Sequence, residues 1–265
     1  MSFIHFNPAM NFEEYKFQYV YEFAQIIQTA IECETMFWNY DESLALEAVT
    51  HFRKISLLHI YIYSQLLNYY HQYYRKNGDI CDISDYNKWI EIGLTYGISF
   101  KTDFSQYANN ESDDNPFFHW YQDNEEVFEC LFDFITDEVF FCLFSNHQLL
   151  VKFNKIVSLL IKNKEMRNWQ ISEQFLEKNG TIKRVRIPKW AKDAVFHRDH
   201  GKCVFCGKDL TNVYTHANKV NFDHIIPLNK FGANDPCNLQ TTCEHCNKSK
   251  NDREDNPSYK YEPWW

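Results

Sequence analysis

The sequence predicts a mainly helical N-terminal domain followed by a small α+β C-terminal domain. Residues 1–180 contain only four Gly and two Pro but 37 of the 47 aromatic residues, so helix breakers are rare and core-forming side chains are plentiful. Residues 181–265 instead contain two Cys-x-x-Cys couplets, Cys203–Cys206 and Cys243–Cys246, with strand-like and loop-like segments between them. A chain of 265 residues is long enough for both domains.

The first domain is expected to be a helical bundle. Asp41 suits the N-cap of a long helix from about Ser43 to Asn77, and Gly78 suits its end. Side chains recur there at spacings of four and three, as on one helix face: Ile55, His59, Ile62, Leu66, Tyr69 and Tyr73. Similar patterns predict helices over about residues 124–145 and 147–164, with a loop over 101–120.

The C-terminal domain is expected to consist of short elements. A turn at Gly180 leads into a basic, β-branched segment, and Pro188 suits the first position of a helix that ends at Gly201. The pattern then predicts strands over residues 220–226 and 238–242, a loop over 229–236 between them, and a helix over 244–251. The predicted order of the last three elements is therefore ββα.

The four cysteines of the couplets predict a structural zinc site. Four thiolates make a closed tetrahedral site and leave no open position for a reactive water molecule. So small a domain lacks the apolar area to hold its shape, and zinc would supply the missing folding energy, on the order of 10 kcal/mol. The other cysteines are scattered, so we expect free thiols rather than disulfides: Cys33, Cys81, Cys130, Cys142 and Cys237.

Charge divides the chain at the same place. Residues 1–180 carry 13 Lys and Arg against 26 Asp and Glu, a net charge of −13, whereas residues 181–265 carry 14 against 10, a net charge of +4. A phosphate backbone should therefore prefer the C-terminal domain. The cations expected to approach it are Lys183, Arg184, Arg186, Lys189, Lys192, Arg198, Lys202, Lys248 and Lys250.

The residues around the couplets resemble the HNH endonuclease family. Their order is Cys-x-x-Cys, then Asp223-His224-Ile225-Ile226-Pro227, then Asn238-Leu239, then Cys-x-x-Cys-Asn247-x-x-Lys250. The resemblance covers about residues 188–252, and order, spacing and residue type agree at nearly every position. Two positions depart from the usual pattern: Asn247 closes the motif in place of His, and Phe231 precedes Gly232 where many members have two glycines.

The resemblance implies a ββα-metal fold and metal-dependent hydrolysis of phosphodiester bonds. It assigns His224 as the general base, and Asp223 and Asn247 as ligands of a divalent ion, Mg²⁺ or Mn²⁺. It also implies that Asn238 ties the loop between the strands and orients His224. Asp223 and His224 are neighbours on a strand, so their side chains point to opposite faces and can divide these tasks.

The predicted function is a metal-dependent DNA endonuclease, and restriction or phage defence are contexts suggested by analogy. Two alternatives stay open: a non-catalytic, zinc-stabilised module that binds DNA or serves as an adaptor, and a nuclease that acts on RNA. Residues 1–180 are expected to form a homodimer, sense a signal or dock a partner protein. No signal peptide or membrane-spanning run is visible, so we expect a cytoplasmic protein with no membrane partner.

Overall fold

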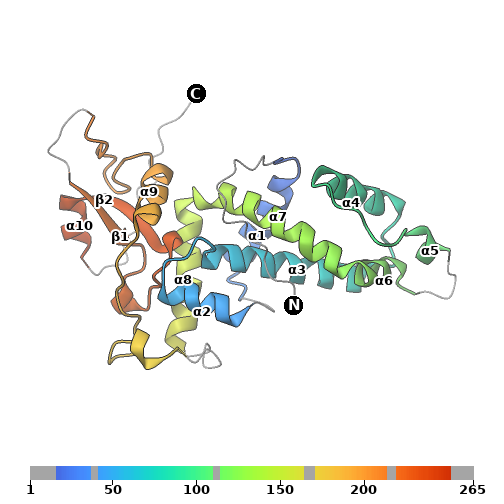
Figure 1. Ribbon diagram of the computed structural model, residues 1–265, viewed down its shortest axis with the longest axis horizontal. Coiled ribbons are helices and arrows are strands. Elements are labelled where there is room, and N and C mark those ends of the chain that lie inside the picture. The colour runs from blue at the N-terminus through green and yellow to red at the C-terminus, as the bar shows by residue number, and fades with distance from the viewer. Residues whose placement is uncertain (1–15, 37–40, 110–113, 164–170, 214–218, 252–265) are drawn as a thin grey trace. The chain divides into compact units, whose positions relative to one another are not determined.

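The computed structural model describes residues 16–36, 41–109, 114–163, 171–213 and 219–251 (Figure 1). These residues belong to two compact units. The first contains residues 16–30 and 61–142, and the second contains residues 31–36, 41–60 and those from 143 onwards. Among the described helices, none is both long and apolar enough to cross a bilayer.

The first unit is a set of helices packed around aromatic side chains. It contains most of α1 (Val20–Glu32), α3 (Leu57–Asn77) and α7 (Glu125–Phe144), together with α4 (Ile83–Thr95), α5 (Ser105–Ala108) and α6 (Pro116–Asp123). Tyr70, Trp89, Phe128 and Phe132 are buried there and contact one another ring to ring. The predicted helical character is confirmed, and α7 is the helix predicted over residues 124–145.

The loop predicted over residues 101–120 is wrong in part, because α5 and the first half of α6 lie within it. Asn115 caps α6 by accepting a hydrogen bond from the Phe118 amide, and Pro116 occupies the first turn. Phe117 and Trp120 of the same helix are fully buried. The polar residues and the proline that suggested a loop therefore also mark the start of a helix.

The single helix predicted from Ser43 to Asn77 is wrong. The structure has two helices there, α2 (Glu42–Thr50) and α3, separated by a break. The predicted start is confirmed, because the Asp41 carboxylate accepts hydrogen bonds from the amides of Ser43 and Leu44. The predicted end is confirmed as well, because α3 ends at Asn77, just before Gly78.

The break between α2 and α3 is explained by contacts within the second unit. The Asn234 amide donates a hydrogen bond to the Val49 carbonyl at 2.9 Å, near the end of α2. The Asp235 carboxylate accepts a hydrogen bond from the Leu57 amide at 2.8 Å, at the start of α3. Polar groups that a continuous helix would have paired internally are thus paired with a distant loop.

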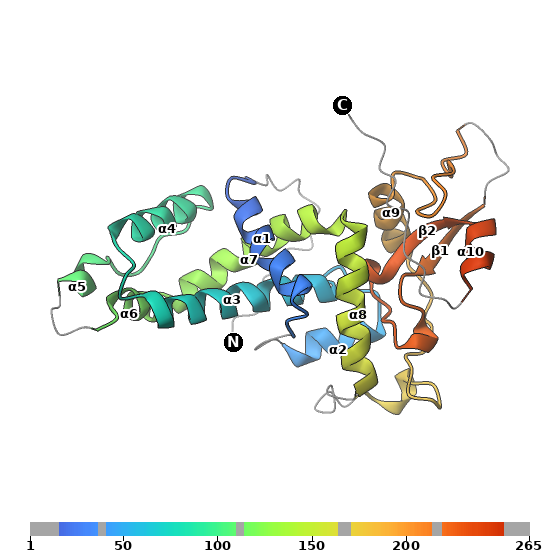
Figure 2. The ribbon, with the colours of Figure 1, turned by 180° about the vertical axis from the view of Figure 1, so that it is seen from behind.

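The second unit contains a β-hairpin with helices on both sides. β1 (Val220–His224) and β2 (Leu239–Cys243) are antiparallel, with Val220 opposite Cys243 and His224 opposite Leu239. α9 (Lys189–Arg198) packs against β2, and α10 (Glu244–Lys250) packs against both strands (Figures 1 and 2). α8 (His147–Asn163), the helix predicted over residues 147–164, contacts the turn at Pro236–Asn238. The predicted ββα order is confirmed.

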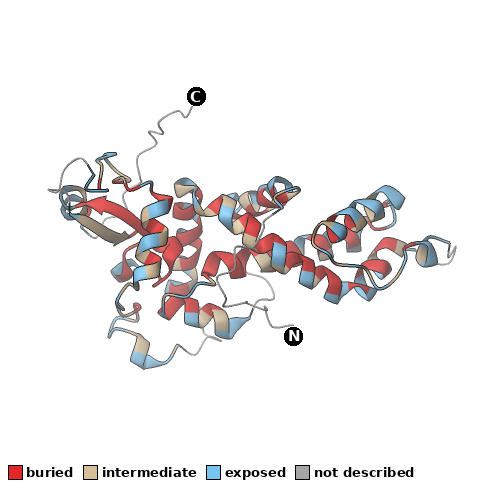
Figure 3. Ribbon diagram, turned by 45° about the horizontal axis from the view of Figure 1, so that its top comes forward, coloured by how far each residue is buried: buried red, intermediate tan, exposed pale blue. Residues whose placement is uncertain are grey.

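The two strands are buried to different extents. All five residues of β2 are buried, whereas four of the five residues of β1 are half-buried (Figure 3). The packing of α9 on β2 accounts for this difference. β1 carries Asp223, which is half-buried, and His224, which is the buried residue of this strand.

The compact units and the predicted domains divide the chain differently. The sequence suggests a boundary at residue 180, yet α2 and α8 belong to the same unit as the hairpin. Asn154 of α8 donates a hydrogen bond to the Cys237 carbonyl at 2.9 Å, and the Cys237 thiol donates to Ser56 at 3.4 Å. A functional boundary at residue 180 stays a prediction, and a fragment cut there would lose these contacts.

A buried ionic network joins α9 to β2 and α8. The Asp199 carboxylate accepts hydrogen bonds from Arg198 Nε and from the Thr241 amide, both at 2.6 Å, and His147 Nε2 lies 3.0 Å from it. Burial by itself would raise the pKa of Asp199. The charge of Arg198 and the hydrogen bonds from His147 and Arg198 outweigh burial, and they lower the pKa from 3.8 to about 2.

We expect Asp199→Asn to lower the free energy of unfolding at pH 7 by about 3 kcal/mol or more, because Arg198 stays buried without its counter-ion. In the wild type, the lowered pKa stabilises the folded state above about pH 4. That contribution, about 2 kcal/mol, is lost as the pH falls from about 4 to about 2. Urea unfolding between neutral and acidic pH checks this, with Asp193→Asn, an exposed carboxylate of α9, as control. A difference between wild type and Asp199→Asn that does not shrink on acidification would contradict the argument.

Candidate functional site

The four couplet cysteines meet at one place in the second unit. The ligand atoms of Cys203, Cys206, Cys243 and Cys246 all lie within 4.8 Å of one another, and the Sγ atoms of Cys206 and Cys243 are 3.9 Å apart. A tetrahedral zinc ion with Zn–S bonds of about 2.3 Å places sulfur atoms about 3.8 Å apart. The donor set therefore fits zinc, and the cluster predicted from the sequence is confirmed.

Local backbone geometry positions these cysteines. The first couplet forms a tight turn in which the Gly207 amide donates to the Cys203 carbonyl, and Gly207 adopts a φ of 71°, which favours glycine. Cys243 ends β2 and caps α10, because its Sγ accepts a hydrogen bond from the Cys246 amide at 3.4 Å. The cluster thus fixes the end of β2 and the start of α10 to the turn that follows α9.

His224 is the last residue of β1, and it is 1% exposed. Burial lowers the pKa of His224 from 6.5 to about 3; the charges of Arg184 and Lys250 act in the same direction, and the Asn234 side chain acts against them. The imidazole is therefore uncharged near pH 7. Within the described part of the chain, neither ring nitrogen makes a hydrogen bond of normal geometry.

Asp223 is held by two donors from neighbouring elements. Lys250 Nζ of α10 lies 2.8 Å from Asp223 Oδ2, and Gln240, which faces Asp223 across the hairpin, donates to the same oxygen at 3.0 Å. The Asp223 side chain is 16% exposed. Among the described residues both contacts use Oδ2, so Oδ1 is the oxygen left to bind a ligand. A carboxylate oxygen fixed in this way suits a hard divalent cation.

Lys250 does not occupy the surface position that the sequence suggested. It is 1% exposed, and its Nζ donates to the His224 carbonyl at 2.8 Å as well as pairing with Asp223. This burial argues against a phosphate contact, and it makes Lys250 a link between the two candidate site residues. Sequence reasoning missed this burial, because the partners of Lys250 lie on β1, far away along the chain.

Arg198 is also buried, contrary to its expected contact with a phosphate backbone. Its side chain is 1% exposed, and besides pairing with Asp199 it donates to the Leu239 carbonyl at 2.6 Å. Its guanidinium carbon lies 4.9 Å from the centre of the Phe144 ring. Arg198 therefore attaches α9 to β2, and sequence reasoning missed this because its partners are far away along the chain.

Asn238 is bonded to the loop that follows His224. Its Oδ1 accepts a hydrogen bond from the Ile226 amide at 2.8 Å, and its Nδ2 donates to the carbonyls of Ile226 at 3.0 Å and Ala233 at 2.9 Å. Gly232 allows this arrangement, because a Cβ atom there would lie 2.0 Å from the Ile226 carbonyl oxygen. The backbone just after His224 is therefore fixed by one fully buried amide side chain.

The same loop is held from α2 and α3, which sequence reasoning missed. The Asn234 side chain donates to the carbonyls of Thr50 at 3.2 Å and Lys183 at 2.7 Å. Asp235 accepts from the Leu57 amide, and burial raises the pKa of this carboxyl from 3.8 to about 6. These partners are far apart in the chain, so no local pattern could have indicated them.

An open groove of ≈ 660 Å³ lies beside the end of β1. Asp223 and His224 line it together with Arg184 and with Asn251, which follows α10. Asn247 is half-buried on α10 and is not among the residues that line the groove. The structure thus brings Asp223, His224 and Arg184 together, and the metal-ligand role of Asn247 stays a prediction.

The other predicted cations differ in their exposure and in whether they form ion pairs. Arg184, Arg186, Lys189 and Lys248 are exposed, and Lys183, Lys192 and Lys202 are half-buried. Lys189 and Lys248 pair with carboxylates one helical turn away, Asp193 and Glu244. Arg184 and Arg186 form no ion pair among the described residues, so a phosphate can approach both without displacing a carboxylate.

Comparison with known families agrees with the site. Residues 203–261, about a fifth of the chain, match a protein-family model described as HNH endonuclease. The matched segment includes the four cysteines, Asp223, His224, Asn238 and Asn247. Searches of curated proteins and of solved structures found no match. The family match confirms the resemblance and indicates a nuclease domain, whose substrate is a nucleic acid.

Proposed function

We propose that residues 181–265 form a nuclease domain that hydrolyses DNA phosphodiester bonds with the help of a divalent metal ion. The observation that carries the proposal is the meeting of Asp223, His224 and Arg184 at one groove, within the unit that contains the HNH match. A carboxylate, a neutral imidazole and a guanidinium offer a metal ligand, a proton acceptor and a phosphate contact.

In this mechanism the scissile phosphate lies in the groove, with Arg184 donating to one of its non-bridging oxygens. His224 accepts a proton from a water molecule, whose oxygen attacks phosphorus as the bond to the leaving sugar oxygen breaks. Lys250 keeps Asp223 and the His224 backbone in fixed relative positions. A Mg²⁺ or Mn²⁺ ion held by Asp223 and Asn247 would neutralise charge on the phosphate and on the leaving oxygen.

Zinc at the four cysteines has a structural task in this proposal, because four thiolates fill its coordination sphere. A reducing compartment keeps such thiolates available, so the protein would act in the cytoplasm.

One site of this kind cuts one strand at a time, and a double-strand break would need two events or a homodimer formed through residues 1–180. A role in restriction or phage defence suits this activity and rests on analogy.

The test is cleavage of supercoiled plasmid by the full-length protein. We expect added Mg²⁺ or Mn²⁺ to convert the plasmid to nicked circles, and dialysed protein without added divalent ion to leave it intact. Zinc is measured in both samples, so that loss of the structural ion is not mistaken for loss of the catalytic one. Linear product that forms together with nicked circles would instead indicate cutting by a dimer.

Two other outcomes would redirect the proposal. Cleavage of RNA together with intact plasmid would replace DNA by RNA as the substrate. A zinc-loaded protein that binds DNA yet cuts nothing with any divalent ion would contradict the catalytic role and would favour a binding module.

A further inference from the structure

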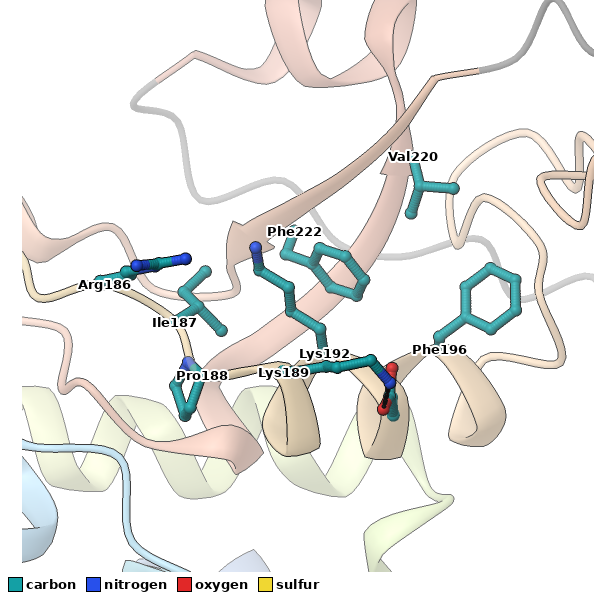
Figure 4. Close-up of a pocket in the computed structure, with 9 residues that line it drawn as sticks. Arg186, Ile187, Pro188, Lys189, Lys192, Phe196, Val220 and Phe222 are labelled. Carbon is teal, nitrogen blue, oxygen red and sulfur yellow. Dashed lines mark hydrogen bonds and ion pairs between the residues drawn. The ribbon is translucent and has the colours of Figure 1, made fainter.

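A second hollow lies on the face of the hairpin opposite to α10. Phe222 precedes Asp223 on β1, and neighbouring side chains of a strand point to opposite faces. Because Asp223 contacts Lys250 of α10, Phe222 points away from α10 and toward the hollow beside α9. Figure 4 shows the Phe222 ring near the centre of this hollow, beside Lys192, with Val220 farther along the strand. We refer to the hollow as the Phe222 pocket.

The Phe222 pocket has an aromatic floor that solvent can reach. Phe222 and Val220 come from β1, Phe196 comes from α9, and all three are half-buried. The hollow measures ≈ 440 Å³, which is within the usual size of small-ligand pockets. Its floor is therefore suited to a flat ring, and stacking on Phe222 would remove apolar surface from water.

The rim of the pocket is positively charged. Arg186, Lys189 and Lys192 line it, against one carboxylate, Asp193, which already pairs with Lys189 at 2.6 Å. Lys192 Nζ lies 5.9 Å from the centre of the Phe222 ring, and within the described ranges neither Lys192 nor Arg186 forms an ion pair. Two positive charges beside an aromatic floor are complementary to a ring that carries a phosphate.

The pocket is adjacent to the candidate active site along two stretches of backbone. Phe222 is the neighbour of Asp223 on β1, and Arg186 is two residues from Arg184, which lines the groove with His224. Two residues of extended chain span about 7 Å, so adjoining phosphates of one strand can reach both arginines. The extended segment that contains Arg184 and Arg186 therefore connects the rim of the groove with the rim of the pocket.

We propose that the Phe222 pocket binds an unpaired nucleobase of the substrate strand, next to the phosphate that is cut. This inference rests on the proposed nuclease function and names the form of its substrate. The base stacks on Phe222 and Phe196, while Lys192 and Arg186 contact the adjoining phosphate. A base inside a perfect duplex has both faces covered by neighbouring bases, so the pocket favours a single strand, a bulge or a flipped nucleotide.

The first test is binding of the full-length protein to fluorescent DNA without added divalent metal. The ligands are a perfect duplex, the same duplex with one unpaired base, and the corresponding single strand. We expect Phe222→Leu to weaken binding of the two unpaired ligands about tenfold and to leave duplex affinity within about twofold. Phe222→Tyr should keep the preference, and Phe134→Leu, an exposed phenylalanine of α7, is the matched control.

A second measurement uses the wild-type protein, so that it does not depend on how the variants fold. Single-stranded DNA with a photoreactive 5-iodouracil is crosslinked to the protein, and the attached peptide is sequenced. Attachment at Phe222 or Phe196 supports the pocket. Attachment at other residues would overturn the proposed base-binding role of the pocket. In the binding test, an equal loss of duplex and single-strand binding in a zinc-loaded Phe222→Leu would overturn it as well.

The outcome also separates this inference from the nuclease proposal. Metal-dependent plasmid nicking together with no effect of Phe222→Leu on any ligand would overturn the pocket alone. A wild-type protein that binds no DNA and cuts no plasmid would overturn both. If the crosslink forms at Phe222 with RNA and not with DNA, the proposed DNA substrate is overturned, whereas the pocket is supported as a site for an unpaired base.

Discussion

Replacing His224 with alanine is expected to lower the rate constant of plasmid nicking by about 10²–10⁴-fold, which is the usual contribution of a positioned proton acceptor. His224 lines the groove with Asp223, and neither nitrogen of its ring makes a normal hydrogen bond among the described residues. The measurement is the single-turnover rate with saturating protein and Mg²⁺. His197→Ala, an exposed histidine of α9, is the matched control and should cut at the wild-type rate.

A buried histidine can also be lost for structural reasons, so this prediction needs a second readout. His224→Ala should keep its zinc, its melting temperature within a few degrees, and its affinity for DNA. Added imidazole should then restore part of the nicking rate in His224→Ala and none in Asp223→Ala, because the missing proton acceptor is replaced only in the first. A variant that releases zinc or no longer binds DNA would instead give His224 a structural role.

The sequence indicated correctly the parts of the site that depend on local spacing. The two cysteine couplets meet because the first is a tight turn, the second starts α10, and the hairpin between them brings the two together. Asp223 and His224 lie at the end of β1 because the strand pattern is local as well. The N-cap at Asp41 and the end of α3 before Gly78 were predictable for the same reason, since capping depends on the few residues around a helix end.

What the sequence could not show depends on partners that are distant in the chain. Arg198 is the clearest case, because a lysine or arginine in the last turn of a helix looks like a surface cation until its contact with Leu239 is seen. The break between α2 and α3 is another, because it is stabilised by Asn234 and Asp235. Lys250 is a third case, because the sequence suggested a phosphate contact and only the structure shows its contacts with Asp223 and the His224 carbonyl.

Removal of the zinc that we propose at the four cysteines is expected to unfold the hairpin and α10, since metal binding contributes on the order of 10 kcal/mol to elements of this size. The apolar cluster at the cysteines adds, within the described chain, Leu210 and a few half-buried side chains, which is little area to replace it. The check is hydrogen exchange of the full-length protein after chelation. Protection should be lost over residues 219–251 and kept in the helices of the first unit. Cys243→Ser should behave like the chelated protein, whereas Cys33→Ser, an exposed cysteine outside the cluster, should not.

The loss of zinc should also abolish nicking, even with excess Mg²⁺, because the cysteine cluster fixes the start of α10 and α10 supplies Lys250 to Asp223 and to the His224 backbone. Returning zinc to the chelated protein should restore both protection and activity, whereas Mg²⁺ alone should restore neither. A zinc-free protein that keeps the protection of β1 and still cuts plasmid would show that packing against α8, α9 and the Asp199 network is sufficient to hold the site. That result would remove the structural role of the metal, and the four cysteines would then need another explanation.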